Sequence, residues 1–341
     1  LFDVFIIGGG INGVGIANDA AGRGLDVMLC EMNDLASATS SASSKLIHGG
    51  LRYLEHYEFR LVKQALAERE VLLKNAPHII SPLRFILPHQ PHLRPAWMIR
   101  SGLFLYDNLS KRVSLKGSKS IKFGADSELV PEIKKGFEYS DAKVSDTRLT
   151  LLNAVSARNK GATIKTRTKC VKATTQDGLW RLSLLDQLTG EQYQVQARTL
   201  VNAAGPWVDK LINVVDTDKT TDSIRLVQGS HIVVPKVTDQ SHAYILQNSD
   251  GRIVFILPYE NDFNLIGTTD LDYEGDPSQA KITDGEIEYL IEITNQYLNK
   301  KITRSDIVHT YCGVRPLLQD EAENAQKATR DYTLELHQSD T

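Results

Sequence analysis

A glycine-rich turn between an apolar run and a small-residue segment is the feature that most constrains this chain. Val4–Ile7 predicts a short buried strand, Gly8–Gly13 (GGGING) a tight turn, and Asn12–Ala21 a helix. A second strand is predicted over Leu25–Cys30 and ends at Glu31. Strand, glycine turn, helix and strand in this order predict a Rossmann-like unit that binds a dinucleotide.

Each residue of this motif has a chemical reason to be there. We expect Gly8 to permit the turn, Gly10 to let the backbone approach a pyrophosphate, and Gly13 to allow close helix–strand packing. The start of the helix, at Asn12, presents N–H groups and a positive dipole end to phosphates. Glu31 is placed to accept hydrogen bonds from ribose hydroxyls, and its charge would repel a 2′-phosphate. The motif therefore favours FAD or NAD over NADP, without separating the first two.

Length and composition narrow the class of protein further. A chain of 341 residues with 39 Lys plus Arg against 42 Asp plus Glu is mildly acidic, so no nucleic-acid binding is expected. Cys30, Cys170 and Cys312 are widely spaced and form no CxxC pair, so neither a disulfide framework nor a metal site is predicted. The longest uncharged run, Val4–Asn18, is too short to span a bilayer.

The rest of the chain predicts a second sheet. Helices are expected over Tyr57–Lys74 and 143–160, and strands recur between residues 162 and 205. Further strand signals fill residues 216 to 282, and Thr283 with Glu286 forms a capping box that starts a helix. The predicted class is α/β, or α+β overall: a Rossmann-like domain and an antiparallel-sheet substrate or cap domain. We assign residues 1–80, 141–212 and 301–341 to the FAD-binding domain, and residues 81–140 and 213–300 to the cap.

Longer strings along the chain resemble one family, the FAD-dependent, quinone-linked glycerol-3-phosphate dehydrogenases, and within it the bacterial respiratory enzymes. Thr39–Leu54 (TSSASSKLIHGGLRYL) resembles the segment that approaches the flavin in this family. Further matches occur in order along the chain: PHLRPAW at 91–97, GFEYSD at 136–141, VNAAGPW at 201–207, GSHIVVP at 229–235, IGTTD at 266–270, GVRPL at 313–317 and TRDY at 329–332. The resemblance implies the glutathione-reductase or D-amino-acid-oxidase type of FAD fold.

The resemblance also implies an incomplete chain. Family members continue with a Gly-Gly-Lys-containing segment and a helical C-terminal domain, and this chain also begins without Met. We therefore expect it to be part of a longer protein, and to bind FAD weakly and turn over slowly by itself.

The serine-rich residues 37–44 lack bulky side chains, so their backbone can lie against a large planar ligand; a flexible linker is the alternative. His48 is expected to contact the flavin through its backbone rather than to act as a base. The resemblance implies the following cofactor-binding residues: Gly8, Gly10, Asn12, Gly13, Glu31, Thr39, Ser40, Ser41, Ser43, Ser44, Lys45, His48, Gly49, Gly50, Val171, Ala204, Gly205 and Arg315.

A phosphorylated alcohol that loses hydride to a flavin needs cations for its phosphate and a base for its hydroxyl proton. The resemblance implies that Arg52, Tyr53 and Arg330 bind the substrate, and that His231 and Arg315 are catalytic. His231 is the expected base, although the roles of His231 and Arg315 are interchangeable at this stage. From the residues alone, His231 can equally be a satisfied core histidine, and each arginine a solvated surface charge.

The implied reaction is oxidation of sn-glycerol 3-phosphate to dihydroxyacetone phosphate, with FAD as hydride acceptor and ubiquinone or menaquinone as the next acceptor. The implied location is peripheral, at the cytoplasmic face of the bacterial inner membrane. The resemblance does not decide between a monomer and a homodimer. The stretch Arg94–Tyr106 is basic and aromatic, which suits a bilayer interface, with an ordinary core-facing helix as the alternative. Three rival functions are an oxygen-dependent glycerophosphate oxidase, an amine or amino-acid oxidase of the same superfamily, and a non-catalytic flavin-binding fragment. The several basic pocket candidates disfavour the amine or amino-acid oxidase.

Overall fold

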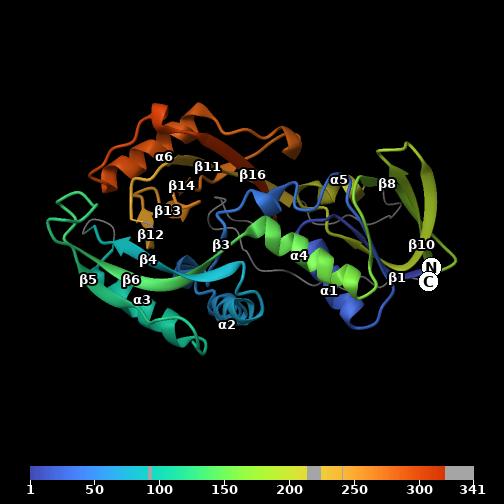
Figure 1. The fold of residues 1–341 in the computed structure, drawn as a ribbon, viewed down its shortest axis with the longest axis horizontal. Coiled ribbons are helices and arrows are strands. Elements are labelled where there is room, and N and C mark those ends of the chain that lie inside the picture. Colours follow the sequence, from blue (N-terminus) through green and yellow to red (C-terminus); the bar gives the residue numbers. More distant parts are fainter. Residues whose placement is uncertain (91–93, 213–223, 240, 319–341) are drawn as a thin grey trace.

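Two sheets organise the chain (Figure 1). The computed structural model describes residues 1–90, 94–212, 224–239 and 241–318. One sheet has six strands in the order β7-β2-β1-β10-β9-β8. The path through the other sheet is β15-β11-β14-β13-β12-β4-β6-β3, with β16 paired to β11 and β5 to β6.

The six-stranded sheet is built from two of the segments assigned to the FAD-binding domain, residues 1–80 and 141–212. Its strands are β1 (Phe2–Ile7), β2 (Val27–Cys30), β7 (Thr163–Lys165), β8 (Thr168–Gln176), β9 (Leu179–Asp186) and β10 (Gln192–Asn202). β1 lies between β2 and β10 and is parallel to both, whereas β8, β9 and β10 form an antiparallel meander.

Both faces of β1 are covered, which explains its continuous apolar sequence. Ile6 belongs to a core cluster with small residues of α1 (Ile11–Gly22) and α4 (Asp146–Asn159), such as Ala17 and Ala157. Phe5 and Ile7 belong to a different cluster, formed with β8, β9 and β10. Alternate residues of the strand therefore serve opposite faces of the sheet.

The second sheet builds the other half of the molecule. Its strands are β3 (Leu46–Ile47), β4 (Ile80–Pro88), β5 (Lys119–Lys122), β6 (Lys135–Val144), β11 (Ile224–Pro235), β12 (His242–Gln247), β13 (Ile253–Tyr259), β14 (Phe263–Gly267), β15 (Leu271–Asp272) and β16 (His309–Leu318). Its described pairs are antiparallel except β4 with β12, which run parallel.

Helices cover the two faces of this second sheet. α6 (Asp284–Tyr297) packs on the face that carries Ile232, while α2 (Phe59–Asn75) and α3 (Ala96–Asn108) pack on the face that carries Val233. The short α5 (Val208–Ile212) follows the end of β10. Among the described residues, no helix is both long enough and apolar enough to cross a bilayer.

Within the described residues, the structure has strands and helices where the sequence predicts them, and two further strands, β3 and β16, bear on the domain division. The capping box at α6 is present, with Thr283 Oγ1 accepting from the Glu286 N–H and the Glu286 carboxylate accepting from the Thr283 N–H. β3 and β16, which our division assigns to the FAD-binding domain, pair with β6 and β11 of the second sheet. The division into two domains remains a proposal.

Candidate functional site

The turn between β1 and α1 has no room for side chains. A Cβ atom at Gly8 would lie 2.2 Å from the Ala203 carbonyl oxygen, and one at Gly13 would lie 1.9 Å from the Gly8 carbonyl oxygen. Gly8 also has a φ of +115°. The first turn of α1 contains no acidic residue, and its N-cap, Gly10, offers no side-chain acceptor. The positive end of the helix is therefore available to an external anion.

A cavity of about 700 Å³ opens at this turn, along the carboxyl ends of β1, β2 and β10. This edge is where open α/β sheets bind their ligands, and the volume lies in the usual range for such sites. The lining includes Gly8, Gly10, Cys30–Asn33, Ala36–Ala42, Thr168–Cys170, Ala203–Trp207 and Tyr311–Val314.

Glu31 lies in the lining as predicted, and its carboxylate is fixed by two backbone donors. One oxygen accepts from the Gly9 N–H at 2.7 Å and the other from the Asn33 N–H at 2.7 Å. A carboxylate has about four acceptor positions, so ribose hydroxyls find free ones here. The glycine turn and Glu31 together fit the adenosine diphosphate part of FAD.

The serine-rich segment is an ordered wall of the cavity, so the linker alternative is wrong. Thr39 Oγ1 donates to the Val314 carbonyl at 2.7 Å, and Ser40 Oγ accepts from the Ile11 N–H at 2.9 Å. Of the predicted residues here, Thr39, Ser40 and Ser41 line the cavity, whereas Ser43, Ser44 and Lys45 lie outside the lining. Ser43 and Lys45 instead bind the carboxylate of Asp146, at the start of α4.

His231 lies on β11, 1% exposed, and does not line the cavity. Its Nε2 hydrogen-bonds Ser44 Oγ at 2.9 Å, and its ring stacks on Tyr311 with the centroids 4.8 Å apart. Nδ1 is buried without a hydrogen-bond partner in the described part of the chain. Burial, with the positive charges of Arg315 and Lys45, lowers the pKa of His231 to about 3, so the ring is neutral near pH 7.

Arg315 lies on β16, next to the cavity-lining Val314. Its Nη1 donates to Asp270 Oδ1 at 2.5 Å, and its Nη2 donates to Thr268 Oγ1 at 3.0 Å. These two bonds orient the guanidinium, and the side chain keeps 30% of its surface exposed. β16 is paired with β11, which brings Arg315 and His231 onto neighbouring strands.

The other predicted residues occupy several places. Ala204 and Gly205 line the cavity, and Val171 lies where the β8–β9 register skips from Cys170 to Lys172. The remainder lie outside the lining of the cavity. Asn12 is exposed on α1, and the exposed His48 accepts a hydrogen bond from the Gly50 N–H through Nδ1 at 3.1 Å. Gly49 and Gly50 precede the 3₁₀ helix Leu51–His56, which contains Arg52 and Tyr53. Arg330 is outside the described residues.

Two site residues were missed by our reading of the sequence. Tyr311 covers the His231 ring and donates from its hydroxyl to the Ser43 carbonyl at 2.8 Å, and Asp146 anchors Lys45. No local pattern announces either residue, because Asp146 lies about a hundred positions from its partners and Tyr311 meets His231 only through strand pairing.

Comparison with known proteins gives the same cofactor. A family model described as "FAD dependent oxidoreductase" matches residues 3–333. The chain belongs to this family. FAD is therefore its cofactor, as predicted. The FAD-binding fold is confirmed with it.

Several curated relatives share the family. The chain is 61% identical over 98% of its length to a glycerol-3-phosphate dehydrogenase of Pseudomonas tolaasii, and 59% identical over 98% to the aerobic glycerol-3-phosphate dehydrogenase of Escherichia coli. It is also 52% identical over 99% to a D-erythritol 1-phosphate dehydrogenase of Brucella abortus. The chain spans 65%, 67% and 68% of these relatives, respectively.

Two solved structures have a similar fold. A glycerol-3-phosphate dehydrogenase from Bacillus halodurans, complexed with FAD, matches with a TM-score of 0.74 at 30% identity, over 94% of this chain and 58% of that one. An L-alpha-glycerophosphate oxidase from Mycoplasma pneumoniae with FAD bound matches with a TM-score of 0.76 at 19% identity, over 96% and 85%. The second likeness shows the fold alone.

The glycine turn gives a prediction with a built-in control. Gly13→Ala places a Cβ atom 1.9 Å from a backbone oxygen, so the turn must open and FAD retention should fall at least tenfold. Gly15→Ala, two residues along the same helix, meets no atom within 4 Å and should keep its FAD. Flavin absorbance after gel filtration measures retention, and equal FAD in both variants would contradict the proposed binding of FAD at the glycine turn.

The buried His231 predicts an acid-sensitive fold. Because its folded pKa is about 3 and its unfolded pKa about 6.5, only the unfolded chain takes up this proton between those values. Above pH 6.5 His231 therefore leaves the free energy of unfolding nearly unchanged, and by pH 5 it lowers that free energy by about 2 kcal/mol. Urea unfolding of His231→Gln should show a correspondingly smaller loss between pH 6.5 and 5. His309→Gln, at an exposed position, is the control, and parallel profiles for wild type and His231→Gln would refute the assignment.

Proposed function

We propose that this protein oxidises sn-glycerol 3-phosphate to dihydroxyacetone phosphate, with FAD as the hydride acceptor. The observation that carries the proposal is 61% identity, over nearly the whole chain, to a relative named for this activity. The cavity wall argues against the fragment alternative, because a decaying cofactor site has no reason to keep the hydroxyls of Thr39, Ser40 and Ser41 hydrogen-bonded. The D-erythritol 1-phosphate relative supports a second candidate, oxidation of a four-carbon sugar-alcohol phosphate.

The residues divide the chemistry between binding and proton transfer. Bound FAD supplies the two-electron acceptor. Arg52, half-buried and without a hydrogen-bond or ion-pair partner in the described residues, is available to an anionic phosphate, with Tyr53 beside it. His231 stays neutral, and its Nδ1, which has no hydrogen-bond partner among the described residues, is the proposed acceptor of the hydroxyl proton. Arg315, oriented by Asp270 and Thr268, faces the negative charge that develops on that oxygen. Arg330 is proposed as a second phosphate ligand from the resemblance alone.

The proposed electron acceptor is a membrane quinone, either ubiquinone or menaquinone, and the proposed location is peripheral at the bacterial inner membrane. Support comes from α3, which has two apolar faces. Leu103 and Tyr106 are buried in the core, whereas Trp97 and Phe104 are 69% and 64% exposed. Exposed aromatic side chains beside Arg94 and Arg100 suit the headgroup region of a bilayer.

Substrate and acceptor can be tested with the FAD-loaded protein. Anaerobic glycerol 3-phosphate should bleach the flavin, whereas glycerol, which lacks the phosphate, should not. Under turnover, a soluble quinone should be reduced much faster than peroxide forms from oxygen. Faster bleaching by D-erythritol 1-phosphate would select the second candidate, dominant peroxide formation would select an oxidase, and no bleaching by any of these would overturn the proposal.

Membrane attachment can be tested on α3. Replacing Trp97 and Phe104 by Ser should reduce co-sedimentation with vesicles containing anionic lipid at least about thirtyfold, because two aromatic side chains, exposed in the free protein, each lose more than about 1 kcal/mol of burial in the bilayer. Leu188→Ser removes a similarly exposed apolar side chain, 79% exposed on a turn of the other sheet, and should bind as wild type does. Equal binding of all three proteins would remove α3 from the interface.

A further inference from the structure

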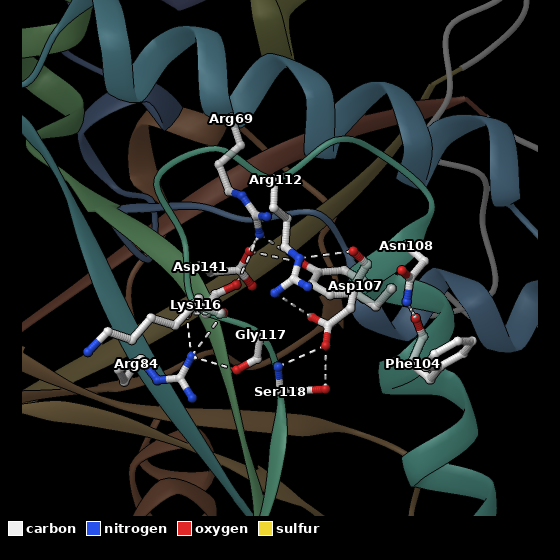
Figure 2. A network of polar contacts seen from close by, with 12 residues as sticks. Arg69, Arg84, Phe104, Asp107, Asn108, Arg112, Lys116, Gly117, Ser118 and Asp141 are labelled. Atoms are coloured by element: carbon white, nitrogen blue, oxygen red, sulfur yellow. Dashed lines mark hydrogen bonds and ion pairs between the residues drawn. The ribbon is translucent and has the colours of Figure 1, made fainter.

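A buried charged cluster lies between α2, α3 and β6, away from the cavity residues (Figure 2). Arg69 on α2 and Asp141 on β6 are each 2% exposed, and Arg69 Nη1 forms an ion pair with Asp141 Oδ1. The same Nη1 donates to the Ser140 carbonyl at 3.0 Å. Two desolvated charges cost nearly as much as their attraction returns, so stability alone does not explain such a pair.

The cluster ends on one backbone group, the N–H of Gly49. This N–H donates to the Tyr106 hydroxyl at 2.8 Å and to Asp141 Oδ1 at 3.1 Å. The Tyr106 hydroxyl in turn donates to Asp141 Oδ1 at 2.8 Å. Burial raises the pKa of Tyr106 well above its usual value, so the hydroxyl keeps the proton that it donates. Tyr106 of α3 and Asp141 of β6 thus both accept from this amide, and Arg69 of α2 pairs with Asp141.

Close packing also restricts the backbone at Gly49, in addition to these hydrogen bonds. A Cβ atom there would lie 2.3 Å from Leu66 Cδ2 and 2.5 Å from the Tyr106 hydroxyl. Gly50 follows with a φ of +72°, and the 3₁₀ helix begins at Leu51. Arg52 is therefore only three residues from an anchored amide, with one sharp turn between them. The backbone of Arg52 therefore follows closely on that anchor.

We propose that Tyr106, held by Asp141 and Arg69, is a positioning residue for substrate phosphate: its hydroxyl fixes Gly49 and, through Gly49, Arg52. The inference rests on the proposed function, in which Arg52 binds the phosphate. Tyr106 touches neither cofactor nor substrate and acts through Arg52.

Tyr139 provides the matched control. It is also 2% exposed, lies in the same core cluster, and its ring centroid is 6.0 Å from that of Tyr106. In the described part of the chain, its hydroxyl has no bond to Gly49 or Asp141. Tyr139→Phe therefore removes a buried hydroxyl from this core without loosening the anchor.

The test compares Tyr106→Phe with Tyr139→Phe in the FAD-loaded protein. Tyr106→Phe removes one acceptor of the Gly49 N–H and the donor to Asp141, and this loss should raise KM for glycerol 3-phosphate about fivefold to tenfold, with kcat within about twofold. In an Arg52→Ala background the same change should add less than about twofold, because the residue through which it acts is gone. Deuterium exchange of the peptide containing Gly49 should also speed up in Tyr106→Phe alone.

Several results would overturn the inference. These are an unchanged KM in Tyr106→Phe, an equal rise in Tyr139→Phe, or a full additive effect in the Arg52→Ala background. If Tyr106→Phe loses its FAD, Arg69→Lys decides instead, since it keeps the buried cation and should raise KM in the same direction but less. Affinity for inorganic phosphate, followed through the flavin spectrum, separates the two proposals. Phosphate binding that weakens in Tyr106→Phe, in a protein that does not oxidise glycerol 3-phosphate, would overturn the function and keep the positioning role. Absence of both activities would overturn both.

Discussion

The close approach of three backbone segments at Gly8, Gly13 and Ala203 is the constraint on which the nucleotide-binding half depends. With carbonyl oxygens about 2 Å from where side chains would begin, only glycine is possible at two of these positions. The approach lets α1 lie against β1 and β10, so its N-terminus faces the cavity at the ends of the same strands. Packing of the sheet and anion binding are thus one geometric requirement.

Local sequence was enough to predict elements whose physics is local. The unit from β1 to β2 follows from a buried strand, a glycine turn and a small-residue helix, and the α6 cap follows from Thr283 and Glu286 three residues apart. Membership of the two sheets was harder. β16 pairs with β11 over ten residues, and this depends on which distant strand offers a complementary face. Nothing within β16 specifies that partner, so the predicted division assigned it to the other half.

The site shows the same distinction between local and distant causes. Glu31 and the glycines were predictable, because a nucleotide imposes its spacing on a single stretch of chain. The partners of His231 were not, since Ser44 and Tyr311 reach its ring from segments nearly 200 and 80 residues away. His231 has features of both of its alternatives: it is packed and bonded like a core histidine, yet it keeps an unpartnered nitrogen. Buried networks such as Arg69–Asp141 leave no periodic trace in a sequence, and only the folded contacts disclose them.

The pairing of β1 with β10 has a consequence for synthesis on the ribosome. Phe2 pairs with Ala197, so β1 stays without one of its two neighbours until β10 has been made. Roughly 200 residues take about 10 to 40 s to translate at 5–20 residues per second. During that interval the apolar β1 has an open edge, which is the kind of surface that chaperones shield and that neighbouring nascent chains can pair with. The glycine turn at the edge of the cavity is completed by Ala203, so the nascent chain can form this part of the cavity wall only after the delay.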